Sequence, residues 1–126
     1  MNDVLVLNDQ NMLQESYETI LKPYGNITTL AVDSKLSFEK VNFYDYKIII
    51  ADFNNRNHTK EFIHICSTYE IHKQLIILIS YFDIQQLSYI ENHIKNISFI
   101  IKKPFVLQKL LDYLDKEILK DRKSVV

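Results

Sequence analysis

Short runs of apolar residues alternate along the chain with longer segments in which apolar residues recur every three or four positions. A continuous apolar run is typical of a β-strand covered on both faces, and the longer spacing is typical of an amphipathic helix. The runs predict strands at 4–7, 27–32, 46–51, 75–79 and 97–101. The helical spacing predicts helices at 12–21, 36–43, 57–69, 84–94 and 106–118, of which the second is weakly patterned and the last is the cleanest.

This alternation sets the expected fold class. Strands that alternate with helices at this spacing form right-handed crossovers, which place the strands parallel in one sheet and the helices on both of its faces. We therefore expect an α/β protein, a (βα)5 sandwich of three layers. In such a sheet the carboxyl ends of all strands lie along one edge, and ligands bind in the crevice there.

The composition is that of one ordinary globular domain. The chain has 126 residues, of which 47% are hydrophobic and 25% are charged. Its net charge of -1 creates no overall field that would attract nucleic acid or an anionic membrane. Cys66 is the single cysteine, there is no apolar N-terminal signal segment, and no apolar run approaches the roughly 20 residues that cross a bilayer. We expect a cytoplasmic protein.

Polar residues end several of the predicted strands. Asn8-Asp9 follow the first strand, Asp52 follows the third, and Lys103 follows the fifth. Because these ends share one edge, two carboxylates and an ammonium are expected to converge. Carboxylates are ligands for Mg²⁺, and a lysine ammonium neutralises a phosphate, so phosphoryl chemistry is the leading interpretation. Ser80 ends the fourth strand, where its hydroxyl could donate to a phosphoryl oxygen.

Each of these residues also has a simpler explanation. Asp52 taken alone is more typical of a turn or a helix cap, and Asp9 could cap the helix that follows it. A serine at the end of a strand is ordinary turn chemistry. The four histidines show no metal-ligand spacing, and we expect them to be surface or partly buried residues. Only the combination of strand-end residues favours a site.

In order and spacing, these residues resemble the response regulator receiver domain, the phosphoacceptor module of two-component signalling. In that family an acidic pair ends the first strand, the phosphoacceptor aspartate ends the third, threonine or serine ends the fourth, and Lys-Pro ends the fifth. The corresponding residues here are Asn8-Asp9, Asp52, Ser80 and Lys103-Pro104-Phe105. The resemblance spans the chain from Val4 to the last helix and implies the flavodoxin-like strand order 2-1-3-4-5.

The resemblance also implies a role for each residue. Asp52 would accept a phosphoryl group from a sensor histidine kinase, with Mg²⁺ held by Asp9, Asp52 and the backbone carbonyl of Asn54; Asn8 is a further candidate ligand. Ser80 and Lys103 would bind the phosphoryl oxygens. Movement of Ser80 would change the face built from the fourth helix, fifth strand and fifth helix, through which a homodimer or a downstream protein would bind. Beyond catalysing its own phosphorylation and dephosphorylation, the domain would not be an enzyme.

Several positions depart from the family pattern. They are Asn8 in place of an acidic residue, Asn55-Arg56 in place of Met-Pro, Tyr81 in place of a small residue, and Ile100 in place of the switch aromatic. Phe99 and Tyr81 are the candidates left for that aromatic. The departures keep a second hypothesis open, a receiver-like interaction module that works without phosphorylation. A third, a small flavodoxin-like enzyme, is weaker because the only glycine is Gly25 and a glycine-rich phosphate loop is therefore missing.

The domain organisation follows from the same pattern. We expect one receiver domain over 1–120 and a polar tail at 121–126, where a linker to an output domain would start. Nucleic acid would be a partner only through such an output domain, and no membrane partner is expected.

Overall fold

The computed structural model describes residues 2–10, 14–68 and 74–118. The strands are β1 (Asn2–Asn8), β2 (Gly25–Ala31), β3 (Ile48–Asp52), β4 (Leu75–Ser80) and β5 (Phe99–Lys102). The α-helices are α1 (Gln14–Leu21), α2 (Lys35–Glu39), α3 (Arg56–Thr68), α4 (Ile84–His93) and α5 (Leu107–Ile118). Two 3-10 turns, η2 (Lys22–Tyr24) and η3 (Phe43–Asp45), follow α1 and α2. The predicted tail at 121–126 lies outside the described residues.

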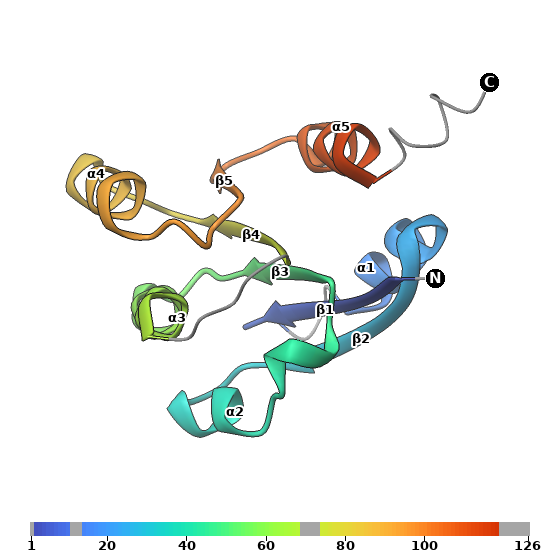
Figure 1. The fold of residues 1–126 in the computed structure, drawn as a ribbon, viewed down its shortest axis with the longest axis horizontal. Coiled ribbons are helices and arrows are strands. Elements are labelled where there is room, and N and C mark those ends of the chain that lie inside the picture. The colour runs from blue at the N-terminus through green and yellow to red at the C-terminus, as the bar shows by residue number, and fades with distance from the viewer. Residues whose placement is uncertain (1, 11–13, 69–73, 119–126) are drawn as a thin grey trace.

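The strands form one parallel sheet in the order β2-β1-β3-β4-β5. The predicted α/β class and the flavodoxin-like order are therefore confirmed. Figure 1 shows α1 and α5 on one side of the sheet and α2, α3 and α4 on the other. All five residues of the central strand β3 are buried, which is why its sequence is almost continuously apolar. Asn8 pairs with Asp52 in the register of β1 and β3, so both strands end at the same level.

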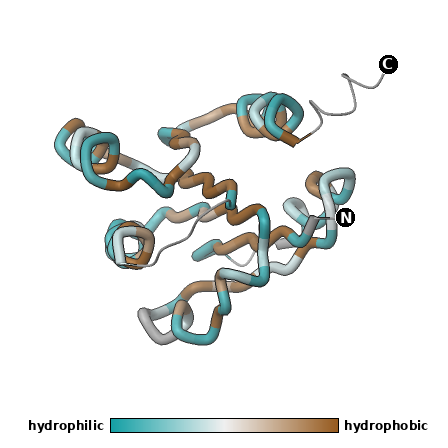
Figure 2. Tube along the Cα trace, viewed as in Figure 1, coloured by the Kyte–Doolittle hydropathy of each residue, from teal (hydrophilic) through white to brown (hydrophobic). Residues whose placement is uncertain are grey.

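Two apolar cores lie on the two faces of the sheet, and Figure 2 shows the hydrophobic strands between them. Alternate residues of each strand enter one core or the other, as the twofold alternation of a strand requires. The core on the α2, α3 and α4 side contains an aromatic group formed by Phe38, Phe43, Phe53 and Phe62. The core on the α1 and α5 side contains Tyr17, Leu21, Tyr24, Leu110 and Leu114.

The clearest difference from the predicted elements lies after β2. The spacing predicts a helix over 36–43, but α2 ends at Glu39 and Phe43 begins the turn η3. Asn42 precedes this turn, and its side-chain oxygen accepts a hydrogen bond from the Tyr44 N–H at 3.2 Å. Asparagine side chains offer the backbone such local bonds in competition with helix. Phe43 still reaches the core, but from a turn.

No helix within the described residues is both long enough and apolar enough to cross a membrane.

Burial of Cys66 gives a prediction about alkaline stability. The thiol is fully buried, and burial raises its pKa from the ordinary 9.0 to about 12. Above pH 9.0 the unfolded chain ionises this thiol while the folded chain holds the proton, so stability is complete below that pH and falls as pH rises towards 12. We expect urea unfolding to show a steeper loss of stability between about pH 9 and 11 in the wild type than in Cys66→Ala. Equal slopes in the two proteins would contradict this.

Candidate functional site

Asp52 lies at the carboxyl end of β3 and forms an ion pair with Lys103. Oδ1 of Asp52 is the atom that faces the Lys103 ammonium. Both side chains are buried, with exposed fractions of 3% and 9%. The Lys103 backbone is fixed to the end of β4, because its N–H donates to the Ser80 carbonyl at 2.8 Å. The Lys103-Pro104 peptide bond is cis. A buried pair of this kind is far less screened than a surface ion pair.

The Lys103 ammonium has two further neighbours. It donates to the side-chain oxygen of Asn54, two residues after Asp52, at 2.6 Å. It also lies 5.8 Å from the centroid of the Tyr81 ring, within the range of a cation–π contact. Asn54 and Tyr81 therefore help to hold the ammonium over the end of the sheet.

Tyr17 reaches the other oxygen of Asp52 from α1. Its hydroxyl donates to Asp52 Oδ2 at 2.5 Å, and the side chain is buried. Burial, followed by the charge of Asp52 and this hydrogen bond, raises the pKa of the phenol well above its ordinary value. The phenol of Tyr17 therefore stays protonated near neutral pH and acts as a neutral hydrogen-bond donor. Both oxygens of Asp52 have a partner.

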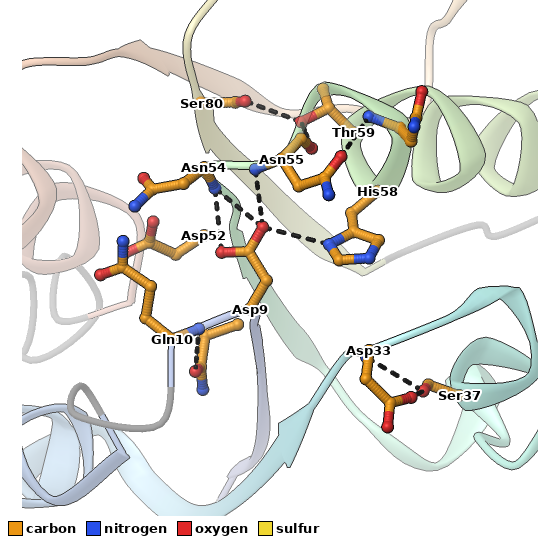
Figure 3. Close-up of polar contacts among 12 residues, drawn as sticks. Asp9, Gln10, Asp33, Ser37, Asp52, Asn54, Asn55, His58, Thr59 and Ser80 are labelled. Carbon is orange, nitrogen blue, oxygen red and sulfur yellow. Dashed lines mark hydrogen bonds and ion pairs between the residues drawn. The ribbon is translucent and has the colours of Figure 1, made fainter.

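Asp9 is turned towards the loop between β3 and α3, as Figure 3 shows. Its carboxylate accepts hydrogen bonds from the N–H of Asn54 at 2.9 Å and from the N–H of Asn55 at 2.8 Å. Nδ1 of His58 lies 3.1 Å from Asp9 Oδ2, and both side chains are largely buried. Backbone N–H groups just before a helix have no helical acceptor, so Asp9, which directly follows β1, satisfies them. Asn54 links Asp9 to Lys103.

Ser80 faces α3. Its hydroxyl lies 2.7 Å from the hydroxyl of Thr59, and both residues are fully buried. Thr59 in turn donates to the carbonyl of Asn55 at 3.3 Å. The hydroxyl of Ser80 is therefore tied to the β3–α3 loop through Thr59, as Figure 3 shows.

The two candidates for the switch aromatic lie in different places. Phe99 packs in the α1 and α5 core, where its ring stacks on Tyr113 with centroids 4.1 Å apart and planes 8° apart. This is the face of the sheet opposite to Thr59 and the hydroxyl of Ser80. Ile100 packs on the α3 side. Tyr81 is 44% exposed and lies beside Lys103, so it is the aromatic residue next to the strand-end cluster.

Asn8, the last residue of β1, is fully buried. Its side-chain oxygen accepts a hydrogen bond from the Gln10 N–H at 3.1 Å, and its side-chain nitrogen has no hydrogen-bond partner among the described residues. Its oxygen is thus already engaged in this structure.

Three residues of the cluster escaped the sequence reasoning, namely Tyr17, His58 and Thr59. Tyr17 fits the apolar stripe of its helix and was indistinguishable from a core residue, although a buried tyrosine hydroxyl usually needs a partner. Thr59 lies on the buried side of α3, where a polar side chain likewise needs a hydrogen-bond partner. His58 is six residues before His64, and only the loop geometry reveals that it meets Asp9.

The oxygen atoms gathered here are of the kind that Mg²⁺ prefers. Asp9 and Asp52 supply two carboxylates, and no group of three or more His, Cys, Asp or Glu side chains suited to a metal occurs among the described residues. A third protein ligand would therefore be a carbonyl or amide oxygen. The donor set, two carboxylates and a carbonyl or amide oxygen, therefore fits the ion in its chemistry.

The comparisons with known proteins concern the fold. No known family profile and no curated protein matches the sequence. A response regulator receiver protein from Pseudomonas putida is 21% identical with a TM-score of 0.67, and the match covers 92% of this chain and 97% of that one. A signal receiver domain of a two-component histidine kinase from Clostridium thermocellum is 19% identical with a TM-score of 0.69, covering 94% and 98%. The non-phosphorylated HemR receiver domain from Leptospira biflexa is 14% identical with a TM-score of 0.63, covering 94% of each chain. The chain has the fold of receiver domains over nearly its whole length.

Proposed function

We propose that the chain is a cytoplasmic receiver domain that accepts a phosphoryl group on Asp52 from a sensor histidine kinase. The observation that carries the proposal is the buried Asp52–Lys103 pair at the carboxyl edge of the sheet, with Asp9 linked to it through Asn54. The receiver fold of the solved neighbours supports it. Receiver domains are signalling domains rather than classical enzymes.

The proposed chemistry is a displacement at phosphorus. A carboxylate oxygen of Asp52 attacks the phosphoryl group of a phosphohistidine, the P–N bond breaks, and the electron pair of that bond stays on the histidine nitrogen. The new P–O bond makes an aspartyl phosphate. Lys103 neutralises part of the added charge, and Ser80 leaves Thr59 to donate to a phosphoryl oxygen.

We include Mg²⁺ in the proposal, held by the carboxylates of Asp9 and Asp52 and by the backbone carbonyl of Asn54. Bound there, the ion would offset negative charge on the transferring phosphoryl group. Asn8, with its oxygen on Gln10, is a weaker candidate ligand. Asp9 has to turn part of its carboxylate away from the loop N–H groups and His58 for this role.

The output face of the proposal consists of α4, β5 and α5. Release of Thr59 by Ser80 would change the contact between the end of β4 and α3. Ile84 at the start of α4 is 83% exposed, and Val106 just before α5 is 74% exposed. These side chains provide the apolar surface through which a homodimer or a downstream protein would bind.

A second function is favoured by one observation. The oxygens of both Asp9 and Asp52 already have partners in this structure. A receiver-like module that binds its partner without phosphorylation would need only this closed arrangement. Binding of a phosphoryl analogue separates the two functions.

Beryllofluoride with Mg²⁺ is the direct test, since it imitates a phosphoryl group on an aspartate. We expect it to shift the amide signals of Asn54, Ser80 and Lys103 in the wild-type protein and to leave Asp52→Asn unchanged. A small phosphodonor should add one phosphoryl group to the wild type alone, measured by intact mass. Wild-type spectra that match those of Asp52→Asn would refute phosphorylation and favour the second function.

A further inference from the structure

Tyr17 is a residue of the cluster to which the proposed chemistry gives no role. Its ring is buried in the core between the sheet and α1, and its hydroxyl ends 2.5 Å from Asp52 Oδ2. A tyrosine side chain has an apolar ring and one polar atom, its hydroxyl oxygen. Because the ring of Tyr17 lies in the apolar core, its hydroxyl group is the part that contacts the carboxylate. The helix α1 thereby makes a direct contact with the proposed acceptor.

The two oxygens of Asp52 are held by donors of different kinds. Oδ1 faces the ammonium of Lys103, a positive charge that also suits a phosphorylated aspartate. Oδ2 accepts from the neutral hydroxyl of Tyr17. A carboxylate that reacts beside a cation uses one oxygen to form the bond to phosphorus and the other to ligate the ion. The Tyr17 hydroxyl therefore occupies an oxygen that the reaction requires.

We propose that Tyr17 is a positioning residue that acts as a latch on Asp52: its hydroxyl holds Oδ2 in a closed arrangement, and it must leave before a cation and a phosphoryl group can bind. This inference rests on the proposed function and adds the control of the same site. The Tyr17 latch makes the resting domain a poor acceptor and makes α1 part of the machinery that opens it.

A further observation supports the latch. A cavity of about 370 Å³ adjoins Tyr17 and Asp52, and its other lining residues include Ile20, Phe105 and Leu107. The phenol ring therefore has open space beside it into which it can turn. Opening requires a competing ligand for Oδ2.

The chain contains a matched control. Tyr24 donates to Asp115 Oδ1 at 2.5 Å, and its ring lies in the same core on the same side of the sheet. Tyr24→Phe removes a tyrosine–carboxylate hydrogen bond of equal length, but the acceptor of that bond is Asp115 on α5 and not Asp52. An effect found in Tyr17→Phe and not in Tyr24→Phe therefore belongs to the site.

The test is a Mg²⁺ titration of the wild type, Tyr17→Phe and Tyr24→Phe, followed through the amide signals of Asp9 and Asn54, without any phosphodonor. We expect Tyr17→Phe to bind Mg²⁺ about 10- to 100-fold more tightly than the wild type, which is the factor expected for removing a hydrogen bond to a charged group. Tyr24→Phe should stay within about twofold of the wild type. Far-UV circular dichroism confirms folding; if Tyr17→Phe fails to fold, Tyr17→Leu removes the same hydroxyl with a smaller apolar side chain.

The outcomes separate the latch from the proposed function. Unchanged or weaker Mg²⁺ binding in Tyr17→Phe overturns the latch, because the hydroxyl would then orient Asp52 rather than block it. No Mg²⁺ binding in any variant also overturns the latch, because the hydroxyl would then have no cation to exclude. Beryllofluoride is then added to the same samples. If it binds none of them although Tyr17→Phe has gained affinity for Mg²⁺, the latch stands and phosphorylation is refuted. If it binds all of them with equal affinity and Mg²⁺ binding is also equal, phosphorylation stands and the latch is refuted.

Discussion

Lys103→Met should lower the free energy of unfolding by about 3–5 kcal/mol, the range measured when one partner of a buried ion pair is removed. Methionine keeps most of the apolar stem of lysine and removes the ammonium. Asp52, which is 3% exposed, would then be left in the interior without its cation and with Tyr17 as its remaining described donor. Urea unfolding followed by circular dichroism measures the change.

The neighbouring residue is the control for this substitution. Lys102 is exposed at the end of β5, and Lys102→Met should change stability by no more than about 0.5 kcal/mol. The double variant Asp52→Asn with Lys103→Met removes both charges, so it should be more stable than Lys103→Met alone. A loss below about 1 kcal/mol in Lys103→Met would contradict a buried pair.

The sequence was sufficient to place Asp52 and Lys103 on the same edge of the sheet. Their positions follow from strand ends, and strand ends follow from where each apolar run stops. The same reasoning places Asp9 and Ser80 at that edge. Backbone topology can be predicted from the sequence because it depends on long patterns, which tolerate an error of a residue at either end.

The directions of the side chains could not be predicted in this way. Ser80 meets Thr59 in this structure, while Asp9 meets the loop at Asn54 and Asn55. Each direction is decided by which unpaired donor or hydroxyl lies nearest in space, and that neighbour comes from another element of the chain. A strand-end position limits a polar side chain to one edge, but the choice of partner is tertiary.

The aromatic group on the α3 side of the sheet shows how the core supports the site. Phe62 on α3 lies 5.9 Å from Phe53, measured between ring centroids, and Phe53 directly follows Asp52. Thr59, one turn before Phe62, holds the hydroxyl of Ser80. The packing of α3 against the sheet therefore sets the positions of Thr59 and Phe62 relative to Asp52.

Phe62→Ala should accordingly lower the free energy of unfolding by about 3–5 kcal/mol, the usual cost of a phenylalanine-to-alanine substitution in a core. Phe62 has no exposed surface, and it contacts the rings of Phe38, Phe43 and Phe53, so its removal leaves a cavity among three rings that are fixed by other elements. Tyr44→Ala is the control, because Tyr44 is 61% exposed and its loss should cost about 0.5 kcal/mol or less. Equal losses in the two variants, measured by urea unfolding, would mean that α3 does not pack on the sheet through Phe62, and the support that α3 gives to Ser80 through Thr59 would lose its structural basis.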